Sequence, residues 1–136
     1  GFVIIRNHLV KYVGHDSDVK IPESVKIIGE KAFDENKEIK KAVLPDSVER
    51  ICFQAFHNCS ELESICIPSS INRIGMFAFY GCSKLETVVL PLEINEVESR
   101  VFHKCSALKT IKIPPNVKRI GMGAFEECRT TVSGYR

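Results

Sequence analysis

The six cysteines of this sequence could take part in more kinds of chemistry than its other residues, because thiols form disulfides, bind zinc and act as nucleophiles. Four of them recur at a constant spacing: Cys59, Cys82, Cys105 and Cys128. In stacked repeats the side chains of such a column run parallel instead of toward one another, and no pair has the Cys-x2-Cys spacing of a zinc site. We therefore expect reduced, buried cysteines that act as small hydrophobic side chains.

The other reactive side chains give no stronger indication of catalysis. Cys66 is expected on an exposed face, but its strand has no histidine or basic neighbour that would activate the thiol. His57 and His103 share a column with Tyr80 between them, so they should lie about 10 Å apart, too far to share a metal ion. We expect no catalytic residue, no metal site and no cofactor.

Composition and motifs exclude several classes of function. No phosphate-binding loop or nucleophile elbow occurs, and no carboxylate pair is embedded in an apolar segment, so an enzyme is not expected. Lysine plus arginine number 19 against 17 for aspartate plus glutamate, and the two signs are interspersed through every repeat, which is not the footprint of a nucleic-acid-binding protein. No apolar run reaches the length of a membrane span, about 18 residues or more, so this chain is not expected to insert into a membrane.

Two further columns show which elements must position these residues. Proline stands at positions 22, 45, 68, 91 and 114, and phenylalanine at 33, 56, 79, 102 and 125, so both columns share the 23-residue period of the cysteines. A fixed period of this length is typical of a solenoid, in which each repeat forms one coil of a stack. We predict a single domain over 1–136, with a cap at 1–15, five coils over 16–128 and a short end at 129–136.

One coil can be followed from Leu62 to Cys82. Residues 62–67 alternate as a strand, and Pro68 ends it because proline cannot donate to the ladder. A shorter extended piece, 71–74, follows on the opposite side, and 76–82 is compact enough for one helical turn that buries Phe79. The sequence thus predicts an α/β solenoid with a parallel sheet on one face, and short strands and helical turns on the other.

The two ends differ in their patterns. Residues 2–14 indicate two strands joined around Arg6 and Asn7, a β-hairpin that would cap the first coil. At the other end the 23-residue register requires leucine at 131 and isoleucine at 134, whereas the sequence has Thr131 and Gly134. The last coil is therefore expected to be curtailed, and to be frayed or to associate with a second copy.

The whole repeat resembles a known family. Its unit, read most cleanly from Leu108 to Cys128, is Leu-x-x-Ile-x-Ile-Pro-x-x-Val-x-x-Ile-Gly-x-x-Ala-Phe-x-x-Cys, and it is similar to the BspA-like class of leucine-rich repeats. The repeat departs from this unit at 97–101. The resemblance implies a bacterial surface or secreted protein that binds other proteins or cells, hence an extracellular or cell-surface location. The unpaired cysteines point instead to a reducing compartment, and this conflict stays open.

Residues that vary between coils are the candidates for binding. On the predicted sheet face they are Lys20, Lys41, Val43, Ser64, Cys66, Thr87, Val89, Thr110 and Lys112. One interpretation is that they only stabilise the sheet through cross-strand pairs. The other is a shallow protein-binding surface, with an apolar centre and a polar rim.

Two functions remain at this stage. The first is a noncatalytic protein-binding module of a bacterial surface or secreted protein, acting in adhesion or in recognition of host or matrix proteins through the sheet face. The alternative is a structural spacer or self-assembling repeat unit, which would associate through its C-terminal coil.

Overall fold

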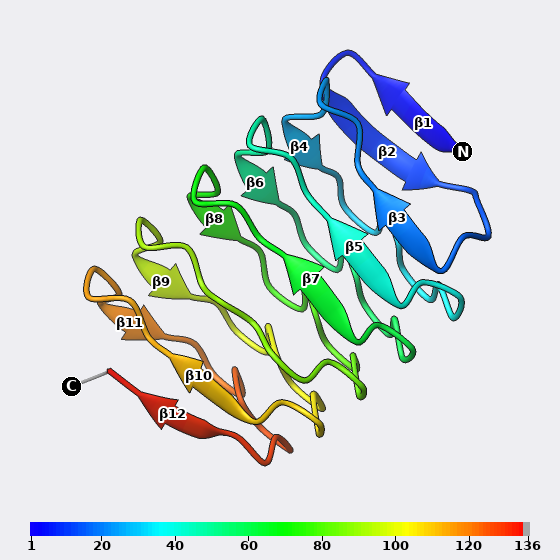
Figure 1. Ribbon diagram of the computed structural model, residues 1–136. Coiled ribbons are helices and arrows are strands. Elements are labelled where there is room, and N and C mark those ends of the chain that lie inside the picture. The colour runs from blue at the N-terminus through cyan, green and yellow to red at the C-terminus, as the bar shows by residue number, and fades with distance from the viewer. Residues whose placement is uncertain (135–136) are drawn as a thin grey trace.

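The computed structural model describes residues 1–134 as a stack of five coils, which begin at residues 18, 41, 64, 87 and 110. Coils one, two, three and five each contribute one strand to both of two rows that run side by side down the stack, and coil four contributes a strand to one of them (Figure 1). The three-residue row contains β3 (Asp18–Lys20), β5 (Lys41–Val43), β7 (Ser64–Cys66), β10 (Thr110–Lys112) and β12 (Thr131–Ser133). The two-residue row contains β4 (Ile27–Ile28), β6 (Arg50–Ile51), β8 (Arg73–Ile74), β9 (Glu96–Val97) and β11 (Arg119–Ile120).

The repeat period sets the register of the parallel strands. Lys41 pairs with Ser64, and Arg50 pairs with Arg73, each partner lying one full repeat later in the chain. Because the spacing is constant, side chains of one type fall on one line along the stack. The alternation within each strand then sends one line inward and the next outward.

The inward lines form a single hydrophobic core. At its centre lie stacked aromatic rings, with centroids 4.8–5.7 Å apart from Tyr12 to Phe125. Phe56, Phe79 and Phe102 are fully buried. This separation is close to the spacing of neighbouring strands, so the rings stack without disturbing the strand register.

The prediction of a helical turn in each coil is wrong, because within residues 1–134 the chain forms no helix. In coil three the N–H groups of Phe77, Phe79 and Gly81 donate to carbonyls of coil four at 2.8–3.2 Å. The N–H groups of Ala78 and Tyr80, which lie between them, donate to carbonyls three residues earlier in the same coil. An α-helix requires each amide to donate to the carbonyl four residues earlier, and a 3₁₀-helix requires consecutive amides to donate to the carbonyl three residues earlier. Alternate amides are committed to the next coil, so the segment is a series of turns.

Backbone conformation in these turns also excludes a helix. Two columns have left-handed φ angles, between 53° and 76°: Lys31, Gln54, Phe77, Arg100 and Gly123, and then Glu35, Asn58, Gly81, Lys104 and Glu127. The left-handed conformation costs a residue other than glycine about 1–2 kcal/mol. Most of these residues donate their own N–H to a carbonyl of the next coil, as Phe77 does to Ser99, and these hydrogen bonds offset that cost.

The predicted N-terminal hairpin is confirmed. Strands β1 (Phe2–Ile5) and β2 (His8–Tyr12) pair antiparallel, and β2 continues in parallel onto β4. Tyr12 is buried and its ring stacks on Phe33 at 5.1 Å. The hairpin therefore closes the aromatic column as well as the sheet.

The C-terminal coil forms a strand where the sequence indicated only a curtailed end. Strand β12 pairs with β10, with Thr131 opposite Thr110 and Val132 opposite Ile111. This coil is shorter than the regular repeat, so Val132 takes the place that the 23-residue register gives to Gly134. Residues 135 and 136, the end of the expected self-association segment, lie outside the described residues.

The contact between coils three and four, which we call the seam, has no strand ladder in either row of the described residues. The sheet in order β1-β2-β4-β6-β8 ends at β8, and β9 pairs instead with β11. In the three-residue row a single bridge, Ser64 with Thr87, is the pairing between these coils within residues 1–134. Backbone hydrogen bonds across the seam persist in the turns described above.

A glycine column explains part of the opening. An ideal Cβ on Gly75 would lie 2.8 Å from the backbone nitrogen of Phe53, and one on Gly121 would lie 2.4 Å from that of Ser99. Coil four has Glu98 at the equivalent position, and this residue is buried. The side chain of Glu98 therefore occupies the space into which, at Gly75 and Gly121, the backbone of the preceding coil fits.

A side chain in the glycine column is not sufficient to separate two neighbouring coils. Cys52 occupies the same column, and its N–H still donates to the Ile28 carbonyl of the preceding coil at 2.9 Å. Coil four has two further departures. Val101 replaces the alanine of the other coils, and Glu93 replaces a serine. In coil three that serine, Ser70, donates its hydroxyl to the preceding coil at 2.7 Å, which a carboxylate cannot do. Together these changes add volume and remove a hydrogen bond at the seam.

Candidate functional site

The candidate binding residues all lie on the three-residue row or its continuation in coil four. Lys20, Lys41, Cys66, Thr87, Val89, Thr110 and Lys112 are exposed, and Val43 and Ser64 are half-buried. Val89 is the most exposed large hydrophobic residue of this face, at 80%. The row thus presents these side chains outward, with aliphatic groups among hydroxyl and lysine groups.

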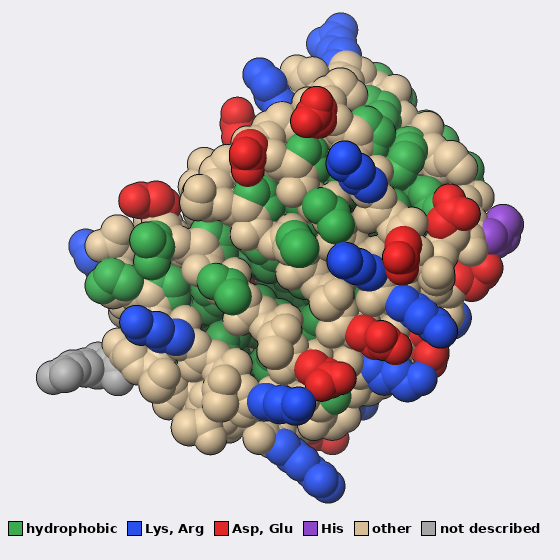
Figure 2. Space-filling view, in the orientation of Figure 1, with side chains coloured by type: hydrophobic (Ala, Val, Ile, Leu, Met, Phe, Trp, Pro, Cys, Tyr) green, Lys and Arg blue, Asp and Glu red, His purple; other side chains and the backbone are tan. Residues whose placement is uncertain are grey.

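A groove opens beside Val89, where the sheet is interrupted. It has a volume of about 440 Å³ and is lined by Thr87, Val88, Val89, Leu90, Leu92, Thr110, Lys112, Pro114 and Pro115. Within the described part of the chain, residues 88–90 form no ladder with β10, which leaves space between coils four and five. In the space-filling view, hydrophobic side chains surround a hollow on this face (Figure 2).

Leu92 is the groove residue that sequence reasoning missed. It is 65% exposed and follows the column proline Pro91, at a position that the other coils give to Glu23, Asp46, Ser69 and Pro115. A single leucine in a largely polar column was the available signal. Together with Val89 it makes coil four the most apolar part of this face.

Charged side chains gather at the other edge of the row, where the strands begin. Lys84 binds Glu61 at 2.7 Å and Lys109 binds Glu86 at 3.1 Å, each across neighbouring coils. Figure 2 shows this mixed band of blue and red beside the hydrophobic area. Such exposed pairs contribute little to stability. We therefore interpret the charged band as a polar border of the apolar surface.

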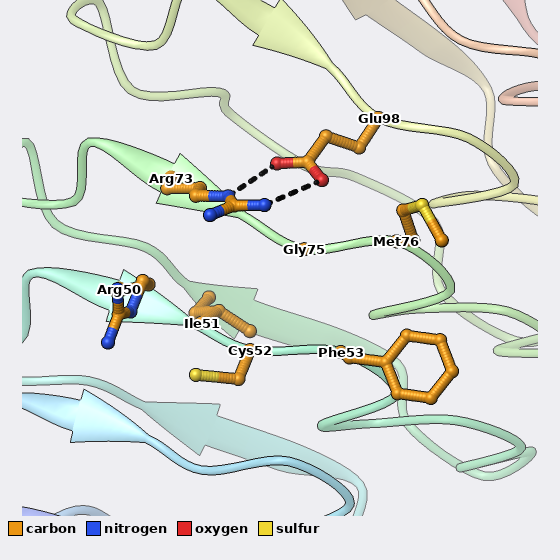
Figure 3. A pocket seen from close by; sticks show the side chains of 8 residues that line it. All are labelled: Arg50, Ile51, Cys52, Phe53, Arg73, Gly75, Met76 and Glu98. Atoms are coloured by element: carbon orange, nitrogen blue, oxygen red, sulfur yellow. Dashed lines mark hydrogen bonds and ion pairs between the residues drawn. The ribbon is translucent and has the colours of Figure 1, made fainter.

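A second hollow, of about 270 Å³, lies on the two-residue row (Figure 3). Gly75 forms part of its lining because the residue has no side chain, and Arg73 reaches across it to the Glu98 carboxylate at 2.9 and 3.4 Å. The Glu98 side chain is 9% exposed and that of Arg73 is 59% exposed. This ion pair crosses the seam, and its arginine neutralises a carboxylate that would otherwise be buried as a charge.

The cysteine column is buried in its centre, and all six cysteines are free thiols. Each column thiol also donates a hydrogen bond to the carbonyl of the column phenylalanine in the preceding coil. Cys82 Sγ lies 3.2 Å from Phe56 O, and Cys105 Sγ lies 3.0 Å from Phe79 O. Burial raises the pKa of Cys59 to about 12, so that thiol stays protonated. Treating these cysteines as hydrophobic side chains missed their role as donors.

At two places that sequence reasoning missed, one histidine meets two carboxylates. His57 Nδ1 lies 2.7 Å from Asp34 Oδ1, with Glu35 beside them. His103 Nε2 lies 3.0 Å from Glu127 and 3.7 Å from Glu126. The signal was present, because Asp34, His57, Tyr80, His103 and Glu126 form one column at 23-residue spacing. The distance between the two histidines, taken alone, does not reveal these contacts with carboxylates.

The repeat unit decides the family. A family model described as the BspA-type leucine-rich repeat region matches six copies over residues 4–132. The chain belongs to this family. The match begins within β1, so it extends beyond the five coils into the N-terminal hairpin.

Solved structures of this fold agree with the assignment. TpLRR, a leucine-rich repeat protein of T. pallidum, is 30% identical, with a TM-score of 0.84 over 93% of this chain and 62% of TpLRR. A leucine-rich cell surface protein of Faecalibacterium prausnitzii is 26% identical, with a TM-score of 0.71 over 96% of this chain and 52% of that protein. The pneumococcal vaccine antigen PcpA, at 20% identity and a TM-score of 0.61 over 93% of this chain and 44% of PcpA, shares the fold.

This BspA-type chain spans less than two thirds of the length of TpLRR and of the F. prausnitzii protein. No protein of curated function matches its sequence. Among residues 1–134 there is no helix with the length and hydropathy needed to cross a membrane.

Proposed function

We propose that this chain is a noncatalytic protein-binding module of a bacterial surface or secreted protein, and that it binds its partner in the groove of the three-residue row. The single observation that carries the proposal is the exposure of Val89 and Leu92 at the mouth of that groove. Similarity to a leucine-rich cell surface protein of F. prausnitzii supports the location. Adhesion to a host or matrix protein is the form of binding that we propose to test first.

The groove favours an extended segment of a protein partner. Its lining is aliphatic and proline-rich, with Lys112 at its border and Thr87 and Thr110 as hydroxyl groups. An apolar side chain of the partner would displace water from Val89 and Leu92, while a neighbouring carboxylate would pair with Lys112. An apolar centre with a polar rim is the usual composition of a protein interface.

The test is a binding assay of the purified domain against immobilised extracellular-matrix and epithelial surface proteins. Burial of one valine or leucine contributes about 1.5–3 kcal/mol, and each step of about 1.4 kcal/mol corresponds to a tenfold change in Kd. For any protein that the domain binds, we expect Val89→Lys with Leu92→Glu to weaken binding at least tenfold.

Met122→Lys is the matched control, because Met122 is also an exposed hydrophobic residue but lies outside the groove. It should leave the Kd unchanged. Equal binding by the groove variant and the unmodified domain would reject the groove as the site. Failure of the unmodified domain to bind any of these proteins would reject the host or matrix class of partner.

A further inference from the structure

The turn edge of the stack brings a histidine of coil two against two carboxylates of coil one. His57 Nδ1 is 2.7 Å from Asp34 Oδ1. One donor atom from each of Asp34, Glu35 and His57 lies within 4.8 Å of the other two. The Asp34 and His57 side chains are 23% and 18% exposed. One nitrogen and two oxygen donors therefore converge at a half-buried point that solvent can still reach.

The carboxylate of Glu35 is held in place by groups outside this trio. Asn58 Nδ2 donates to Glu35 Oε2 at 3.1 Å, and Lys37 Nζ lies 3.4 Å from Oε1. The hydrogen bond from Asn58, with Lys37 in support, lowers the pKa of Glu35. Ligating carboxylates in metal sites are commonly oriented by such secondary hydrogen bonds.

We propose that Asp34, Glu35 and His57 bind a divalent transition-metal ion, with Zn²⁺ as the reference ion. Zinc accepts imidazole nitrogen and carboxylate oxygen at about 2.0–2.2 Å in tetrahedral geometry, which places neighbouring donor atoms about 3.4 Å apart. The imidazole and Asp34 need to separate only slightly from their present hydrogen bond. Water completes the coordination, and the ion joins coil one to coil two.

A second trio, His103 with Glu126 and Glu127, shows why the first is the better site. His103 Nδ1 is buried with no hydrogen-bond partner among the described residues. A metal ion on Nε2 would move the ring proton to Nδ1, where it would have no acceptor. His57 contacts Asp34 through Nδ1 instead, and its Nε2 is not a buried atom without a hydrogen-bond partner. We therefore expect the second trio to bind Zn²⁺ more weakly.

The test is calorimetric titration of the purified domain with Zn²⁺, with Co²⁺ absorption as a readout of the ligands. We expect one Zn²⁺ per chain in the tighter phase. His57→Ala and the isosteric variants Asp34→Asn and Glu35→Gln should each weaken that phase at least tenfold. Mg²⁺ at millimolar concentration should not compete, because imidazole selects transition metals over Mg²⁺.

Two variants separate this site from other histidines. His15→Ala removes a histidine that also lies 2.8 Å from a carboxylate of the next coil, Glu38, but has no third donor among the described residues, and it should leave the tight phase intact. His103→Ala should also leave it intact. Absence of zinc binding, or loss of the tight phase in either control variant but not in His57→Ala, would overturn the proposal. Circular dichroism of every variant is the check that the fold is retained.

Discussion

At the scale of single residues, the cysteine column shows how one side chain meets two requirements of the stack. Each thiol is small enough to lie beside the phenylalanine column, and its S–H group satisfies a carbonyl of the preceding coil. Coil one has Asn36 in this place, and its side chain accepts hydrogen bonds from the backbone of Glu38 and Ile39. The sequence predicted burial from periodicity, but the hydrogen bond depends on a thiol direction that periodicity does not define.

We predict that Cys66 reacts with a thiol reagent before any cysteine of the buried column. Thiolates are the reactive form, and with a pKa of about 12 only about one molecule in ten thousand has Cys59 ionised at pH 8. Burial also raises the pKa of Cys82 and Cys105. Mass spectrometry after brief labelling of the native protein should find the adduct on Cys66, which is exposed. Uniform labelling of all six cysteines would contradict the burial of the column.

At the scale of elements, the seam shows how substitutions within one coil weaken its contact with a neighbour. The amide of Gly75 donates to the Ile51 carbonyl at 2.8 Å and that of Gly121 to Val97 at 2.7 Å. The equivalent amide of Glu98 makes no backbone hydrogen bond within residues 1–134. Local stability should therefore be lower at the seam than at the contacts on either side.

Amide hydrogen exchange measured by NMR provides the test at this scale. We predict that the amides of Asn95 and Glu98 exchange at least tenfold faster than those of Asn72 and Gly75, which donate across the preceding contact. The double variant Glu98→Gly with Val101→Ala should slow exchange at residue 98, because it restores the glycine and alanine of the other coils.

Cys52→Gly is the control for that variant, since it changes the same column at a contact that is already closed. It should leave exchange at the seam unchanged. Equal exchange rates for Glu98 and Gly75 in the unmodified protein would show that the seam is not a weak contact.

Prediction of these elements from the sequence succeeded where a single residue type decides the outcome. The proline and phenylalanine columns defined the coil, and Arg6 and Asn7 marked the hairpin turn. The turn at 76–82 was mistaken for a helix because its left-handed residues include Phe77, which nothing in the sequence marks as left-handed. The opening of the seam and the groove at Leu92 depend on how the side chains of one coil pack against the next coil. The pattern within a single repeat does not show this packing.

At the scale of the whole molecule, the stacked rings make the core continuous from the hairpin to coil five. Each coil contacts only its neighbours, so the stability of the stack is the sum of contributions from coils and from their contacts. A substitution in the middle of the column removes contacts with both neighbours. Phe79, which stacks on Phe56 at 5.4 Å and on Phe102 at 5.6 Å, is such a residue.

We predict that Phe79→Ala lowers the free energy of unfolding by about 3–5 kcal/mol, because it leaves a cavity between two coils. Val89→Ala should change it by no more than about 0.5 kcal/mol, as expected for an exposed side chain. Urea unfolding followed by circular dichroism measures both. Large and equal losses would show that Val89 is not on the exposed face of the sheet.

The open seam also has a mechanical consequence. When the two ends of the stack are pulled apart, the load passes through every contact between coils in series. The contacts on either side of the seam have paired strands in the two-residue row, whereas the seam has none there among the described residues. The stack should therefore yield first between coils three and four, and the protein would extend as two blocks before either block unravels.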